Sequence, residues 1–223
     1  MVSPTCTVWW AAPVDPADAP HLVALLDEHE RARLARFRRA DDRARYLAAH
    51  ALARRAVAAV GCTDPAALVI DRTCRCGEPH GKPSVPGGPE FSLTHAGDLV
   101  GVAVHARPVG LDVERARPMS DLAGVAVHAR SPAEPVPDAA GFFRLWTRKE
   151  ALLKTTGRGL ASPMSDITLD GTRVASWTGE GAPDGPVWLV DLSPAPGHPG
   201  AVAGMGASAP EVVEEDGTAL LRR

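Results

Sequence analysis

The chain lacks a long apolar segment: none of its hydrophobic runs approaches the ~18 residues that a transmembrane helix needs. Its first residues also lack the charged and then apolar pattern of a secretory signal peptide. Only 4 cysteines occur, and their spacing forms no evident disulfide framework. Together these features predict a reduced, cytoplasmic protein without a membrane partner.

A large excess of positive charge is also missing. The formal net charge is −3 at pH 7, which argues against a general nucleic-acid-binding protein. The charge is nevertheless uneven, because arginines gather between residues 31 and 55. Two interpretations stay open for this stretch. It is either a solvated helix face or a basic rim, where the forked guanidinium groups would bind an anionic ligand.

At 223 residues, the chain is long enough for one domain or for two fused lobes. Hydrophobic periodicity predicts helices over 21–38, 42–60 and 122–127, and a further helix around Trp146. It predicts strands over 5–12, 68–70, 91–93, 99–105, 110–114, 167–169, 187–192 and 201–205. Asp41 and Gly61 are expected to cap the second helix at its start and its end.

The Gly- and Pro-rich residues 74–89 predict a long functional loop, and the tail from Val212 is expected to be frayed. Helices followed by strands occur twice along the chain. This order predicts an α+β protein of two similar halves that divide near Pro108, with an N-terminal lobe at 1–108 and a C-terminal lobe at 109–223.

Three carboxylates stand out for their spacing. Asp112 and Glu114 alternate with apolar residues on a short strand, so both point to one face. Glu150 and Lys154 are four apart on a helix and also share a face. Carboxylate oxygens favour Mg²⁺, whose coordination is often completed by substrate phosphates. For Asp112 and Glu114 alone, the alternative is an edge strand protected by charge.

These segments resemble the two signature motifs of the 4′-phosphopantetheinyl transferases of the Sfp type, a G-[IV]-D-x-E strand and a W-x-x-K-E-x-x-x-K helix. The matching residues are Gly110-Leu111-Asp112-Val113-Glu114 and Trp146 to Lys154. Further blocks resemble the family's G-K-P, F-N-[IL]-S-H-S and G-K-G-L segments. They are Gly81-Lys82-Pro83, Phe91-Ser92-Leu93-Thr94-His95-Ala96 and Gly157-Arg158-Gly159-Leu160. The blocks occur in the family's order and span most of the chain.

The resemblance implies two pseudo-twofold lobes with the active site in the cleft between them. It implies a monomeric, Mg²⁺-dependent enzyme that transfers the 4′-phosphopantetheine arm of coenzyme A to a serine of an acyl, peptidyl or aryl carrier protein, with release of 3′,5′-ADP. Such carriers serve polyketide, nonribosomal peptide or fatty acid synthases. The docking site for the carrier is expected near residues 131–137, with Arg117 and Arg130 as contacts; an ordinary flexible loop is the alternative.

The resemblance also implies residue roles, which we transfer from the family's motifs to the matching positions of this chain. The implied metal ligands are Asp112, Glu114 and Glu150, and the implied catalytic residues are Glu150 and Lys154. Whether Glu150 is a base or only a ligand stays open. The implied contacts to coenzyme A are Arg45, Lys82, Thr94, His95, Lys149 and Lys154. Thr94 replaces the family's serine and keeps a hydroxyl, whereas Ala96 loses a second hydroxyl.

Two other functions stay open at this point. One is a metal-dependent pyrophosphohydrolase acting on coenzyme A or nucleotides. The other is a zinc-stabilised interaction module built on Cys62, Cys74, Cys76 and His80, although a C-x-C spacing matches the usual zinc knuckle poorly.

Overall fold

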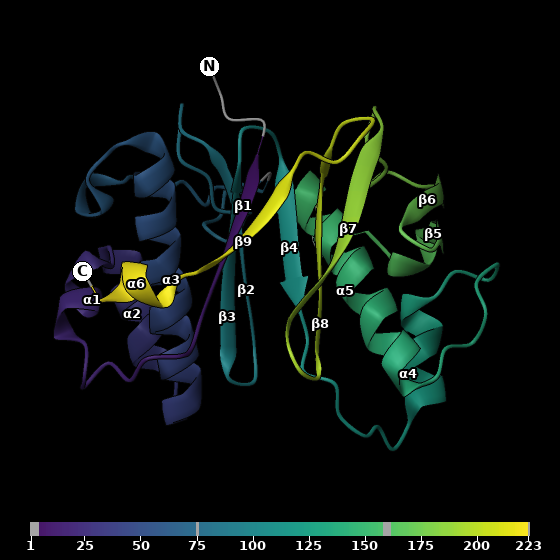
Figure 1. Cartoon of the computed structure of the whole chain (residues 1–223), viewed down its shortest axis with the longest axis horizontal. Coiled ribbons are helices and arrows are strands. Elements are labelled where there is room, and N and C mark those ends of the chain that lie inside the picture. Colours follow the sequence, from purple (N-terminus) through teal and green to yellow (C-terminus); the bar gives the residue numbers. More distant parts are fainter. Residues whose placement is uncertain (1–4, 75, 158–161, 223) are drawn as a thin grey trace.

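Two α+β halves lie side by side in the computed structural model, which describes residues 5–74, 76–157 and 162–222 (Figure 1). Their sheets meet in the middle, and the helices cover the outer sides. The first sheet has the strand order β2-β3-β1-β9, and the second has the order β4-β8-β7. The predicted α+β class with two similar lobes is confirmed.

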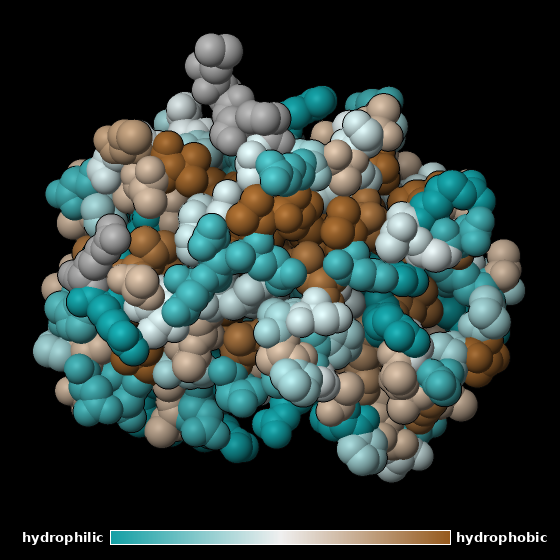
Figure 2. All heavy atoms as spheres, in the orientation of Figure 1, coloured by the Kyte–Doolittle hydropathy of each residue, from teal (hydrophilic) through white to brown (hydrophobic). Residues whose placement is uncertain are grey.

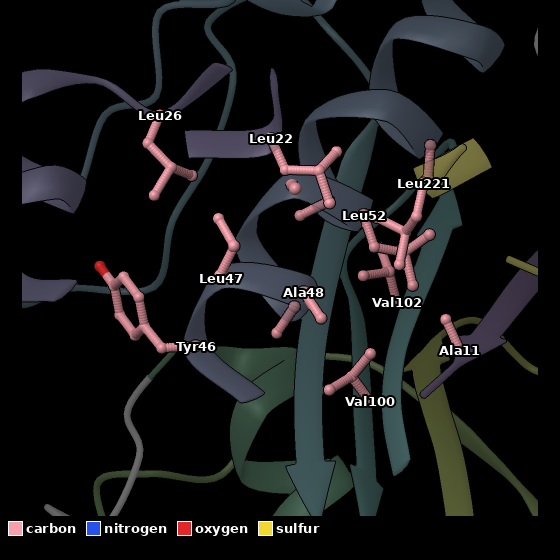
Figure 3. Close-up of a cluster of buried hydrophobic side chains, with 14 of the residues drawn as sticks. Ala11, Leu22, Leu26, Tyr46, Leu47, Ala48, Leu52, Val100, Val102 and Leu221 are labelled. Atoms are coloured by element: carbon pink, nitrogen blue, oxygen red, sulfur yellow. The ribbon is translucent and has the colours of Figure 1, made fainter. Parts of the chain in front are cut away.

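The first half contains the four-stranded sheet and the helices that cover it. The strands are β1 (Cys6–Ala11), β2 (Glu90–Ala96), β3 (Leu99–His105) and β9 (Val212–Asp216). The helices are α1 (Pro20–Leu25), α2 (Glu28–Arg36), α3 (Ala40–Gly61) and α6 (Thr218–Leu221). Leucine, alanine and valine side chains of α3 and β3 fill the core between them, as with Leu52 and Val102 (Figure 3).

Local capping explains why this half differs from the sequence prediction. The helix predicted over 21–38 is two helices, because Asp27 forms a capping box with Glu30 and starts α2 anew. Helix α3 ends at Gly61, and its C-cap is Cys62 in the left-handed conformation (φ 53°), one residue after the cap predicted at Gly61. Its N-cap is Arg39 rather than Asp41. The strand predicted over 68–70 is wrong, because this segment follows a 3₁₀ turn and has no partner strand.

The second half contains the three-stranded sheet, a separate two-stranded sheet and outer helices. Its strands are β4 (Val109–Val113), β5 (Ile167–Asp170), β6 (Arg173–Trp177), β7 (Val187–Ala195) and β8 (His198–Met205). Its helices are α4 (Leu122–Ala129) and α5 (Ala139–Thr156). Asp138 caps α5 through the Gly141 amide, and Gly157 ends it at φ 69°. The elements predicted here from periodicity are confirmed.

The prediction of a frayed tail is wrong. Strand β9 pairs in parallel with β1, and the Trp10 indole N–H donates to Glu214 at 2.8 Å. Helix α6 then packs on α3, where Leu221 is buried. The predicted C-terminal lobe, 109–223, thus contains a segment that belongs to the first sheet. The division near Pro108 itself stays a prediction.

The two halves meet where β2 lies beside β4, a contact that we call the β2–β4 junction. Two hydroxyls of β2 accept hydrogen bonds from amides of β4: Ser92 from Leu111 at 3.0 Å, and Thr94 from Val113 at 3.1 Å. Side chains therefore satisfy strand amides that have no ladder partner on this side. Apolar residues of both sheets, such as Val8 and Val202, are buried together behind the junction.

Polar side chains cover most of the face shown in Figure 2, and apolar ones reach the surface mainly over the central strands. Within the described residues, no helix is long and apolar enough to cross a membrane.

Candidate active site

Asp112 lies in β4 at the β2–β4 junction, and its side chain is almost fully buried. Its Oδ1 accepts hydrogen bonds from the Lys154 ammonium at 2.7 Å and from the Thr94 hydroxyl at 3.3 Å. Its Oδ2 is buried and has no hydrogen-bond partner among the described residues. Burial raises the pKa of Asp112, although Lys154 and Thr94 act in the opposite direction. A buried, unpaired carboxylate oxygen is costly unless a cation reaches it.

Glu114 follows β4 directly and shares the face of Asp112. Its amide donates to the Pro199 carbonyl at 3.0 Å, so the backbone stays beside β8 after the strand ends. The carboxylate is partly exposed and lies 3.5 Å from Arg117. Burial raises the pKa of Glu114, and the negative charge of Asp112 raises it further. The two carboxylates are thus close enough to repel each other.

Glu150 reaches the same place from α5. Burial raises the pKa of Glu150, and the charges of Asp112 and Glu114 add to this rise, while Lys154 lowers it. Lys154 lies one turn further along α5. Its ammonium donates hydrogen bonds to the Leu111 carbonyl at 3.0 Å and to Asp112. Strand β4 and helix α5 therefore bring together the three carboxylates that the sequence predicted, with an ammonium among them.

A divalent cation fits this group of carboxylates. All three donors are hard oxygens, and their mutual repulsion falls when a cation binds. Their oxygens do not all lie within 4.8 Å of one another in the described structure, so some side-chain rotation is needed. Lys154 occupies only Oδ1 of Asp112, so the unpaired Oδ2 remains available to a metal.

Gly110 allows α5 to approach β4 closely, a role that sequence reasoning missed although the glycine opens the motif. A Cβ at this position would lie 2.6 Å from the Thr155 amide and closer still to the Ala151 carbonyl oxygen. Ala151 directly follows Glu150. The bare backbone of Gly110 thus sets how near the Glu150 carboxylate comes to the strand of Asp112.

Replacing Gly110 with alanine is expected to push α5 away from β4 and to lower the free energy of unfolding by about 1–3 kcal/mol or more. Urea unfolding measures the loss. Gly185→Ala is the matched control, because a Cβ there meets nothing within 4 Å. Equal midpoints for the two variants would contradict this account of the close approach.

A group of basic side chains borders the carboxylates on the first half. His95 is exposed and belongs to β2 itself, whereas the sequence prediction placed it after the strand. Partial desolvation lowers the pKa of His95, and the charges of Lys154, Arg45 and His50 lower it further. Arg45 is held by Asp42 at 2.6 Å and by the Gly97 carbonyl at 2.9 Å. These four groups form an electropositive rim suited to an anion.

His50 in this rim was missed by sequence reasoning. It stacks on Tyr46 one turn earlier, with ring centroids 4.0 Å apart, and its Nδ1 lies 3.0 Å from Glu30. The i,i+4 spacing of an aromatic and a histidine on one helix was the available signal. In contrast, Arg54 of the same helix is buried and pairs with Glu30 and Asp27, so it is structural rather than part of the rim.

Lys82 lies at the other end of β4. Its ammonium donates to the Val109 carbonyl at 2.9 Å and lies 3.6 Å from Glu90. Burial lowers the pKa of Lys82, and Glu90 opposes this effect. Val109 and Asp112 are three residues apart, which is about 10 Å along a strand. Lys82 therefore borders the same junction but not the carboxylates.

Two predicted contacts need correction. Lys149 is fully buried, and its ammonium donates to Glu134 at 2.6 Å and to the Ala129 carbonyl at 2.8 Å, so it is not available to coenzyme A. Thr94 is also buried, and its one hydroxyl proton goes to Asp112. The structure gives Thr94 the role of holding Asp112 rather than a direct phosphate contact.

The loop at 131–137 is anchored rather than freely mobile. Glu134 is buried and accepts hydrogen bonds from the amides of Ser131 and Leu169, both at 2.7 Å. Arg130 donates to the Glu134 carbonyl at 2.7 Å, so it holds the loop in place. The last block of the resemblance lies outside the described residues from Arg158 to Leu160.

Two family models match consecutive parts of the chain. The one described as "4'-phosphopantetheinyl transferase, N-terminal" matches residues 10–107, and the one described as "4'-phosphopantetheinyl transferase superfamily" matches residues 108–193. The 4'-phosphopantetheinyl transferase HetI of a Nostoc species is 32% identical over 163 residues, which cover 68% of this chain and 69% of that protein. A 4'-phosphopantetheinyl transferase of Bacillus subtilis is 27% identical over 172 residues, or 73% and 74% of the two chains. The Bacillus subtilis transferase Sfp is 26% identical over 98 residues, or 40% and 44%.

Proposed function

Since the chain belongs to the 4′-phosphopantetheinyl transferase family, we propose that it transfers the phosphopantetheine arm of coenzyme A to a serine hydroxyl of a carrier protein, with release of 3′,5′-ADP. The observation that carries this proposal is the convergence of Asp112, Glu114 and Glu150, with Asp112 Oδ2 buried and unpaired. A pyrophosphate substrate is negatively charged and would be repelled by the three carboxylates. A cation between the pyrophosphate and the carboxylates removes this repulsion.

Asp112, Glu114 and Glu150 would hold the cation, and we propose Mg²⁺ because all three donors are carboxylates. When bound, Mg²⁺ supplies charge neutralisation on the pyrophosphate. Lys154 adds a fixed positive charge that stays on Asp112 Oδ1 and faces the same site. For Glu150 two roles remain proposed: metal ligand, or base that takes the proton of the attacking serine.

The basic groups of the first half would bind the phosphates of coenzyme A. Arg45 and Lys154 both lie near His95, since the charge of each lowers the pKa of the imidazole. Lys82 lies further along β4, where an extended ligand such as coenzyme A would reach it. A phosphate near His95 would raise the pKa of the imidazole again and so favour its charged form.

The proposed partners are acyl, peptidyl or aryl carrier domains of fatty acid, polyketide or nonribosomal peptide synthases. Arg117 is largely exposed and lies next to Glu114, so it is placed to attract an acidic carrier. Val125, Val127 and Val136, on α4 and the loop after it, expose apolar surface that a carrier would cover. A monomer acting in the cytoplasm completes this proposal.

The test is intact-protein mass spectrometry of an apo carrier protein incubated with coenzyme A, Mg²⁺ and the enzyme. The expected result is a mass gain equal to one phosphopantetheine arm, which is lost when Mg²⁺ is chelated. Consumption of coenzyme A without any mass gain on several carrier types would contradict the proposal. The alternative of a pyrophosphohydrolase has no support from the relatives described above, which carry transferase names.

A further inference from the structure

A second group of possible metal ligands lies in the loop at 71–84, away from the carboxylates. The sulfurs of Cys74 and Cys76 and an imidazole nitrogen of His80 all lie within 4.8 Å of one another. Cys76 Sγ is 3.2 Å from His80 Nε2. Within the described ranges, this is the one group of three or more His, Cys, Asp or Glu side chains whose ligand atoms all lie within that distance.

Backbone contacts fix the shape of this loop. Asp71 and Ser84 exchange two hydrogen bonds of 2.9 Å at its base. The Gly77 amide donates to the Cys74 carbonyl at 2.8 Å and closes a tight turn, in which Gly77 takes a φ of 86°. The returning segment of the loop passes so close that a Cβ at Gly81 would lie 2.8 Å from the Thr73 carbonyl oxygen. The turn and the close return bring His80 back to the two cysteines.

The donor types indicate which metal this group prefers. Two thiolates and an imidazole are typical ligands of Zn²⁺, whereas Mg²⁺ takes oxygen ligands. The C-x-C spacing is unusual for zinc, but the turn already brings the donor atoms together. Cys62, which the sequence analysis also named as a candidate ligand, is not part of the group.

We propose that Cys74, Cys76 and His80 bind one Zn²⁺ ion, with a fourth position open to water. The ion would cross-link the two cysteines to the returning segment of the loop that carries His80. Lys82 follows His80 by two residues and reaches the Val109 carbonyl at the start of β4. Zinc therefore holds the segment that carries Lys82, and its binding does not depend on the transfer reaction.

The test is a metal titration of the full chain, reduced with a phosphine and freed of metal. Co²⁺ is added first as a spectroscopic probe, and Zn²⁺ then competes for its site. We expect a thiolate-to-metal charge-transfer band that saturates at one equivalent of bound Co²⁺ and that Zn²⁺ abolishes, whereas Co²⁺ on the carboxylates would give no such band. Cys76→Ser and His80→Ala should each weaken Zn²⁺ binding by ~100-fold or more, since loss of even an outer-shell partner costs ~10–100-fold.

Cys62→Ser is the matched control, because Cys62 is exposed and lies outside the group. It should show the same thiolate band and the same competition by Zn²⁺ as the unchanged protein, and so should Asp112→Asn, which alters only the carboxylate group. Circular dichroism of each variant checks that it is folded. Three results would overturn the proposal: no stoichiometric binding by the reduced protein, Co²⁺ binding without a thiolate band, or the same affinity in Cys62→Ser, Cys76→Ser and His80→Ala.

Discussion

Asp112→Asn is expected to lower the rate of carrier modification by ~10²–10³-fold or more, the usual effect of removing one preorganised electrostatic group. Asparagine has nearly the same size and can still accept a hydrogen bond from Thr94, so the β2–β4 junction should stay intact. It cannot supply the negative oxygen that a divalent cation needs, and it removes the ion pair with Lys154. Initial rates of mass gain on an apo carrier measure the loss.

Asp191→Asn is the control for this variant, since Asp191 pairs with Arg148 on the surface. It should modify the carrier at an unchanged rate. Thermal unfolding with and without Mg²⁺ gives a second readout, because Mg²⁺ should raise the Tm of the unchanged protein and not that of Asp112→Asn. A fully active Asp112→Asn enzyme would refute the metal assignment.

The same three carboxylates determine how the stability of the folded protein changes with pH. The pKa values of Asp112, Glu114 and Glu150 are all raised in the folded protein. Groups of this kind stabilise the fold fully below their unfolded pKa values, and this contribution is lost as the pH rises through the folded pKa values. The three carboxylates thus make the metal-free protein less stable toward neutral pH, and a bound cation offsets the cost.

Lys149→Ala is expected to lower the free energy of unfolding by about 3–5 kcal/mol, because it leaves the buried Glu134 carboxylate without its cation. Chemical denaturation measures this loss. Affinity for coenzyme A, corrected for the folded fraction, should be unchanged. Lys149 faces α4 and not the candidate active site.

Arg148→Ala is the control on the same helix. Arg148 pairs with Asp191 at the surface, so its loss should cost about 0–1 kcal/mol. Similar losses for the two variants would contradict the assignment of Lys149 to the core. A folded Lys149→Ala protein with weakened coenzyme A binding would restore the role that the sequence predicted.

Local patterns in the sequence were enough to predict the elements that carry the carboxylates. Alternation placed Asp112 and Glu114 on one face of a strand, and helical spacing placed Glu150 with Lys154. The same spacing does not tell which neighbour packs against a face. Lys149 therefore remained ambiguous until α4 and Glu134 were seen beside it.

Other parts of the structure were not predicted from the sequence, for different reasons. The break before α2 was predictable, because Asp27 and Glu30 have the spacing of a capping box. The apolar residues 68–70 met the local criteria for a strand but have no neighbour to pair with. The role of Thr94 depends on how two strands from different halves face each other, which no local pattern encodes.

The pairing of β9 with β1 has a consequence for the time course of synthesis. Trp10 and Glu214, which the pairing joins, are 204 residues apart along the chain. Because translation proceeds from the N-terminus, β1 leaves the ribosome long before its neighbour exists. During that interval one edge of β1 is open to strands of other nascent chains. The last contact of the first sheet to form is therefore the one that covers this edge of β1, and β9 then becomes the edge strand of the finished sheet.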